Sequence, residues 1–233
     1  MSELRILAIE TATEACSAAL YIDGDVIQRY QLAPRQHVAL ILPFVDELFN
    51  EAGVNVNQLD AVAFGRGPGS FTGLRIAAGI TQGIAFGADL PVIPVSTLAA
   101  LAQGATRQIP AKKILAALDA RMQEVYWGTF SLDGSGLMTL HGEEAVCAPG
   151  LVARPDGSDW QAAGDGWSSY REALIERLGF EPAACLASLK PQAADVAVLG
   201  AAKFIAGQTV PPEQAAPIYL RDQVAAKPAR QKV

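Results

Sequence analysis

The sequence predicts an α/β protein built by duplication, with two lobes that each hold a mixed β-sheet flanked by helices. Segments typical of strands and helices alternate along 233 residues, of which 51% are hydrophobic. The tripeptide Ile6-Leu7-Ala8 returns as Ile114-Leu115-Ala116, and both copies lead through a strand-like stretch to an Asp-Gly turn, at Asp23-Gly24 and Asp133-Gly134. Short matches arise by chance, so the matching order of elements carries more weight than the repeat itself.

The first lobe is expected to begin with a three-stranded meander at residues 5–10, 15–22 and 26–31, with Asp23-Gly24 as a hairpin turn. From residue 36 to 52 apolar residues recur at three- and four-residue steps, which predicts a helix that Gly53 ends.

A strand at residues 60–65 should lead into a glycine-rich turn and a second helix at residues 72–87. A strand at residues 92–95 and a helix at residues 97–103 follow.

The second half of the chain has fewer patterns that indicate helices or strands. Residues 168–178 and 193–207 have helical patterns, whereas residues 149–159 and Pro211-Pro212 favour loops. Residues 227–233 have little to bury and are expected to form a mobile tail.

Composition excludes several classes of protein. The formal charge of -6 and the pI near 5.0 argue against strong direct tRNA or other polyanion binding, which needs clustered Lys and Arg. Three dispersed cysteines, Cys16, Cys147 and Cys185, fit neither a disulfide framework nor a paired-cysteine zinc site and favour a reducing cytoplasm. Polar residues and prolines interrupt the apolar region at residues 76–105, so we expect no membrane span and, without an export signal, a cytoplasmic protein.

The glycine-rich turn at residues 67–75 has two readings. Its backbone amides could bind an anion at the positive end of the following helix, through Gly67, Gly69, Ser70 and Thr72. It could equally be a tight strand-to-helix connection capped by Ser70 or Thr72. The spacing is not that of a P-loop, and the phosphate-binding lysine is missing.

The second helix contains glycines at every fourth position, Gly79, Gly83 and Gly87. Each mid-helix glycine costs about 1 kcal/mol relative to alanine, so a close neighbour is expected, within the fold or, less readily, across a subunit interface. Together with the apolar face of the first helix, this glycine stripe makes the first two helices the candidate partner interface. Its residues are Val38, Ile41, Phe44, Val45, Leu48, Ile76, Gly79, Ile80 and Gly83.

Glu10 and Asp119 end the first strand of each copy, where open sheets place ligand groups. The pair could orient a metal-bound phosphate, or each acid could simply cap a turn. Asp119 and Arg121 could also form an internal ion pair. With only His37 and His141, no histidine metal site can be assembled, and Ser70 lacks the surroundings of an activated nucleophile, so we expect no catalytic and no metal-binding residues.

The chain resembles the TsaB (YeaZ) family, whose members are paralogues of TsaD in the actin-like ATPase superfamily. The matching segments cover nearly the whole chain: residues 6–13, 67–75, 94–98, 119–126, 164–166 and 217–221. Residues 67–75, joined to Asp119-Ala120-Arg121, are the most specific of these.

The resemblance implies a duplicated actin-like, ribonuclease H-like fold with an N-terminal lobe at residues 1–108, a smaller lobe at 109–216 and a C-terminal segment with a tail at 217–233. It implies a non-catalytic subunit that activates TsaD by heterodimerising with it, so that threonylcarbamoyl is transferred to the adenosine next to the anticodon. TsaE would act as the ATPase and TsaC would supply threonylcarbamoyl-adenylate; a homodimer is also compatible. TsaD-type proteins carry a His-x-x-x-His metal pair, which here reads His37 and Ile41.

The superfamily also implies a nucleotide cleft, with at most weak ATP or ADP binding with Mg. Its candidate residues are Glu10, Thr11, Gly67, Gly69, Ser70, Thr72, Asp119 and Arg121. Two alternatives from other classes remain, a stand-alone ATPase or small-molecule kinase on the same fold and, less favoured, a glycoprotease-type peptidase.

Overall fold

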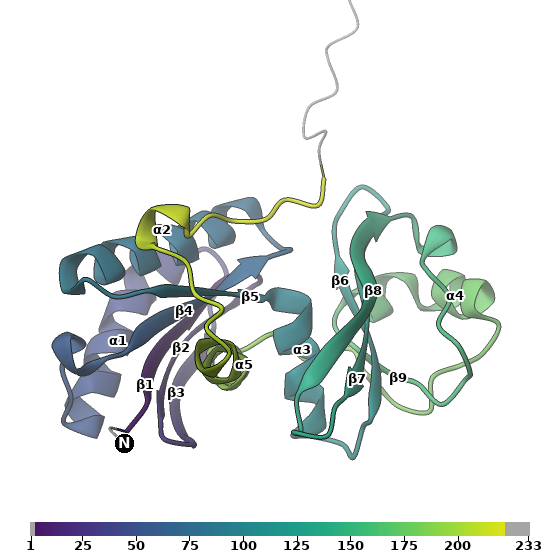
Figure 1. The fold of residues 1–233 in the computed structure, drawn as a ribbon. Helices are drawn as coiled ribbons and strands as arrows, with labels where there is room; N and C mark the ends of the chain where they lie inside the picture. Colours follow the sequence, from purple (N-terminus) through teal and green to yellow (C-terminus); the bar gives the residue numbers. More distant parts are fainter. Residues whose placement is uncertain (1–2, 222–233) are drawn as a thin grey trace, which may run out of the picture.

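The computed structural model describes residues 3–221, which form two lobes with one five-stranded sheet each (Figure 1). In the first sheet the strand order is β3-β2-β1-β4-β5, and in the second it is β8-β7-β6-β9-β10. In each sheet the first three strands along the chain form an antiparallel meander. The fourth strand pairs parallel to the first, and the fifth pairs parallel to the fourth. This shared order confirms the predicted duplicated actin-like α/β fold. The strands are β1 (Arg5–Glu10), β2 (Ala15–Ile22), β3 (Asp25–Leu32), β4 (Ala61–Gly67), β5 (Val92–Ser96), β6 (Lys113–Asp119), β7 (Val125–Leu132), β8 (Met138–Cys147), β9 (Gln161–Ala163) and β10 (Cys185–Leu186).

Helices cover both faces of each sheet. Alternate residues of β1 point to opposite faces, so Leu7 and Ile9 pack with α1 and α2 while Ile6 and Ala8 pack with α5. In the second lobe α3 lies on one face and α4 on the other. The helices are α1 (His37–Ala52), α2 (Phe71–Ala88), α3 (Thr97–Thr106), α4 (Gly166–Leu178) and α5 (Ala193–Ile205), with single 3₁₀ turns at η1 (Val56–Gln58), η2 (Pro149–Leu151) and η3 (Pro212–Gln214).

The internal repeat lies on the central strand of each sheet. Ile6 and Ile114 hold the same place, because each pairs with the first residue of the neighbouring parallel strand, Ala61 of β4 and Gln161 of β9. The match of three residues therefore reflects a true structural equivalence of β1 and β6.

Helix α5 belongs by sequence to the range expected for the C-terminal lobe, but it packs on the first sheet. Its residues Val196 and Ala197 are fully buried in the same core as Ile6 and Ala8. The predicted division at residue 108 therefore separates the two sheets but does not describe where α5 lies.

Several local predictions hold closely and others do not. The first helix ends at Gly53, whose φ of 64° is left-handed, as expected for a C-terminal glycine. β8, β9 and β10 were not predicted, and the single 3₁₀ turns η2 and η3 occupy segments expected to be loops. The expected tail at residues 227–233 lies outside the described residues. Within residues 3–221 no helix is long and apolar enough to cross a bilayer.

Candidate functional site

Glu10, at the end of β1, is completely buried rather than open to a cleft. Its Oε1 accepts a hydrogen bond from the Ala12 amide at 2.6 Å, and its Oε2 accepts one from Thr97 Oγ1 at 3.2 Å. The carboxylate fills the space beside Gly65, where an added Cβ would lie 1.9 Å from Oε2. Burial raises the pKa of Glu10 from 4.5 to about 7, because desolvation penalises the charged form. Of the two readings of Glu10, these contacts fit the acid that caps a turn, and through Thr97 the side chain joins β1 to α3.

The glycine-rich turn packs closely on the segment that follows β1. The Ser70 amide donates to the Ala12 carbonyl at 2.7 Å, and Thr11 Oγ1 donates to the Gly73 carbonyl at 2.7 Å. A Cβ at Gly73 would lie 2.0 Å from the Thr11 carbonyl oxygen, and one at Gly69 would lie 2.6 Å from that of Ala12.

These contacts explain the glycines by close approach of two backbone segments. Ser70 is the N-cap of α2, and its Oγ accepts from the Gly73 amide at 3.5 Å. Of the two readings of the turn, these contacts fit the capped strand-to-helix connection. Thr11 is buried and Thr72 is exposed, so this group of candidates does not share one surface.

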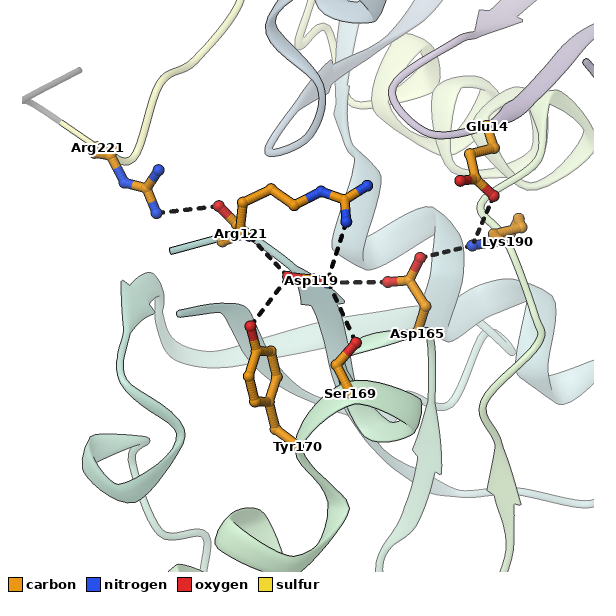
Figure 2. Close-up of polar contacts among 9 residues, drawn as sticks. Glu14, Asp119, Arg121, Asp165, Ser169, Tyr170, Lys190 and Arg221 are labelled. Carbon is orange, nitrogen blue, oxygen red and sulfur yellow. Dashed lines mark hydrogen bonds and ion pairs between the residues drawn. The ribbon is translucent and has the colours of Figure 1, made fainter. Parts of the chain in front are cut away.

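Asp119, by contrast, lies in a polar network between the lobes (Figure 2). Its Oδ1 accepts from the Arg121 amide at 2.7 Å and from the Tyr170 hydroxyl at 3.4 Å, and its Oδ2 accepts from the Ser169 hydroxyl at 3.3 Å. Arg121 Nη1 lies 3.6 Å from Oδ2, which is the ion pair considered from the sequence. The Asp119 amide in turn donates to Asp165 Oδ1 at 2.9 Å.

Lys190 connects this network to the first lobe. Its Nζ lies 2.6 Å from Asp165 Oδ2 and 3.9 Å from Glu14 Oε2, and its side chain is largely buried. Asp165, Lys190 and Glu14 were not candidates in the sequence, because no motif joins residues so far apart along the chain.

The loop after Asp119 has an unusual backbone. Arg121, Met122 and Gln123 all have positive φ, at 60°, 53° and 63°, although none of them is glycine or asparagine. Each such residue costs about 1 kcal/mol or more of strain, which the surrounding contacts must offset. Met122 is 78% exposed at the tip of this loop.

The C-terminal strap, residues 215–221, runs from the first lobe to this loop (Figure 1). The Ile218 amide donates to the Arg66 carbonyl at 2.8 Å, while Arg221 Nη2 donates to the Ala120 carbonyl at 3.1 Å and contacts Glu124. Tyr219 packs on Phe71, with ring centroids 5.5 Å apart. The strap thus ties the start of α2 to the strained loop.

The candidate interface residues divide into two groups. Ile41, Phe44, Val45 and Leu48 are buried in the chain's own core against β1 and β2, so these four are not surface residues of this protein. The three- and four-residue spacing correctly predicted a helix, but the apolar face that it identifies packs against the sheet.

The outer faces of α1 and α2 carry different residues. Gly79 and Gly83 are exposed, and an added Cβ at either would meet no atom within 4 Å. Within residues 3–221 neither glycine therefore has the close neighbour that was the favoured expectation. Ile76 and Ile80 are half-buried.

Apolar side chains are exposed on the same helix pair. Val38 is 70% exposed, Leu42 50% and Phe86 59%, and α1 and α2 contact one another. Leu42 and Phe86 were missed, because their positions fall outside the apolar face that the period selects.

Metal ligands do not gather in the described part of the chain. Within residues 3–221 no group of three His, Cys, Asp or Glu side chains could hold a metal ion. His37 Nε2 lies 2.9 Å from the Thr13 carbonyl oxygen, and His141 contacts Ser131. Both rings therefore have protein partners.

Comparisons with known proteins agree with these observations. Residues 30–228 match the family model described as TsaD, tRNA N6-adenosine threonylcarbamoyltransferase. The tRNA threonylcarbamoyladenosine biosynthesis protein TsaB of Escherichia coli is 45% identical over 96% of this chain and 97% of that protein, and TsaB of Haemophilus influenzae is 39% identical over 96% of each. The solved structure of YeaZ from Pseudomonas aeruginosa superposes with a TM-score of 0.87 at 48% identity and covers 94% of this chain and all of that one.

Proposed function

The chain belongs to the TsaB (YeaZ) family of tRNA threonylcarbamoyladenosine biosynthesis proteins, which is related to TsaD, and we propose that it acts there as a non-catalytic subunit that activates TsaD by heterodimerising with it. TsaE joins the assembled complex as the ATPase, and TsaC supplies the threonylcarbamoyl-adenylate that the complex uses. The outer face of α1 and α2 forms the surface that binds TsaD.

The single observation that supports this surface most is the exposed glycine stripe of α2. Mid-helix glycines cost about 1 kcal/mol each relative to alanine, and Gly79 and Gly83 gain nothing in return within the described chain. A partner helix that approaches the bare backbone closely would recover that cost. Val38, Leu42 and Phe86 expose apolar surface on the same helix pair, as expected of a protein interface.

The site residues support a non-catalytic role. Glu10 is enclosed by the Ala12 amide and Thr97, and burial favours its protonated form. At the positions where the resemblance implies a histidine metal pair of TsaD-type proteins, this chain has His37, whose ring contacts the Thr13 carbonyl oxygen, and the buried Ile41.

The test is formation of threonylcarbamoyladenosine on tRNA by TsaC, TsaD and TsaE, with and without this protein. We expect product only when the chain is present, none from the chain alone, and tight binding to TsaD. Equal product without it would contradict the proposal. Tight binding of ATP·Mg by the isolated chain would instead favour the stand-alone ATPase.

A Gly83→Leu variant tests the surface. We expect it to weaken TsaD binding by about 100-fold, since a bulky side chain would hold the helices apart, with unfolding stability unchanged or higher. Gly134→Leu is the matched control, because that glycine also has open space around it but lies on the β7–β8 turn. Normal TsaD binding by folded Gly83→Leu would contradict the assignment of this face. Loss of self-association in the same variant would show that a homodimer uses it too.

A further inference from the structure

A cavity of about 460 Å³ lies between the lobes and is separate from α1, α2 and the Asp119 network. Its walls come from α5, from the end of β5 with the start of α3, and from the β7–β8 hairpin. The volume is within the range of small-molecule sites, about 300–1,000 Å³, and cavities between lobes are a common place for them.

One end of this cavity is charged. Glu144 comes from β8, and only 7% of its side chain is exposed. It accepts a hydrogen bond from Ser96 and lies 3.8 Å from Arg66 Nη2. Lys203 of α5 lines the same cavity.

This one acid does not fully satisfy Arg66. Arg66 Nε is buried and has no hydrogen-bond partner among the described residues, and the Arg66–Glu144 separation is longer than a hydrogen bond. Burial lowers the pKa of Lys203 and raises that of Glu144, as expected for charges held out of water. Asp133, which also lines the cavity, is engaged by Ser135 and the Leu137 amide within its own turn.

The rest of the lining is largely apolar. Val95 and Leu199 contribute from the first lobe and α5, and Phe130, Met138 and Leu140 from the second sheet. An apolar chamber with one cationic end is suited to a ligand with an apolar body and one anionic group.

We propose that this cavity binds a small amphiphilic anion, whose carboxylate or phosphate meets Arg66 and Lys203 while its apolar body lies against Val95 and Phe130. The inference goes beyond the proposed function and does not depend on it, because none of these residues lies on the outer face of α1 and α2. A ligand here would contact both lobes and so could favour one arrangement of them.

The experiment is an NMR titration of the isotope-labelled full chain with sodium 4-phenylbutanoate, followed by amide shifts. We expect saturable shifts concentrated at residues of β5, β8 and the C-terminal half of α5. The neutral analogue 4-phenyl-1-butanol should bind about tenfold more weakly or worse, since it lacks the charge that the two cations attract.

A Lys203→Met variant should weaken phenylbutanoate binding by about tenfold, whereas Lys112→Met, at an exposed lysine outside the cavity, should leave it unchanged. If Lys203→Met fails to fold, Ala206→Trp narrows the cavity from its exposed rim without removing a charge and should also weaken binding. Amide shifts that do not saturate, or that scatter over the protein, would overturn the proposal. So would equal affinity for the alcohol and the carboxylate, or equal affinity of wild type and the folded cavity variant for phenylbutanoate.

Discussion

Glu10 and Asp119 both end the first strand of a sheet, yet one is sealed in the core and the other lies in a polar network between the lobes. The register of the repeat explains the difference. With Ile6 equivalent to Ile114, Glu10 corresponds to Leu118, and Asp119 lies one position further along.

Successive strand residues point to opposite faces, so this offset of one residue turns the two acids in different directions. Glu10 lies on the α5 face of the first sheet and reaches Thr97 at the start of α3, whereas Asp119 lies on the α4 face of the second sheet and reaches Ser169. Leu118, the true counterpart of Glu10, is buried in the second core. Two acids at the ends of equivalent strands therefore do not make a paired site unless they also share a face.

The largest expected effect comes from Gly65→Ala. Its Cβ would lie 1.9 Å from Glu10 Oε2 and would push the buried carboxylate off its two donors. We expect the free energy of unfolding to fall by about 4 kcal/mol, measured by urea denaturation. Gly134→Ala, where a Cβ meets nothing, should change it by less than about 0.5 kcal/mol. Similar losses of unfolding free energy in the two variants would mean that Glu10 does not fill the space beside Gly65.

The next largest effect is the pH dependence that Glu10 gives to the free energy of unfolding. Because its pKa is raised from 4.5 to about 7 in the folded protein, its stabilising contribution is complete below 4.5 and is lost as the pH rises through about 7. The pH dependence of the unfolding free energy should differ between wild type and Glu10→Gln by about 3 kcal/mol across this window. Parallel profiles of the two proteins, from urea unfolding at about pH 4.5 and about pH 8, would show that Glu10 ionises normally.

Asp119→Ala should have the smallest effect on stability, about 1 kcal/mol, because the side chain is partly exposed and its network can be hydrated. The change should appear locally, as faster hydrogen exchange at Arg121–Glu124, whose left-handed turn loses the bond from the Arg121 amide to Oδ1. A loss as large as that of Gly65→Ala, or unchanged exchange in the loop, would remove the contrast between the two acids.

The elements that could be predicted are those whose signals are local. β1 and β2 were placed to the residue, since the turn at Asp23-Gly24 and the buried runs around it fix their limits. Each end of the five helices was placed within three residues of its position in the structure. β9 and β10, with three and two residues, are too short to show any alternation and depend on their neighbours in the sheet.

The site was harder to predict than the fold. Whether Glu10 is buried depends on α3, which follows it by some ninety positions in the chain, and no local pattern reports this contact. The left-handed run at Arg121–Gln123 has none of the residues that usually mark positive φ. The glycine stripe of α2 signalled a close neighbour, but only the structure shows that the described chain does not provide one.

Helix α5 has a consequence for how the protein is made. Ile6 and Ala8 leave the ribosome well before the helix that covers them, which begins only at Ala193. One apolar face of the first sheet therefore stays open until α5 has been synthesised. A nascent chain halted after residue 108 should therefore be a chaperone client rather than a finished unit, because the first lobe is completed only after the strands of the second have been translated.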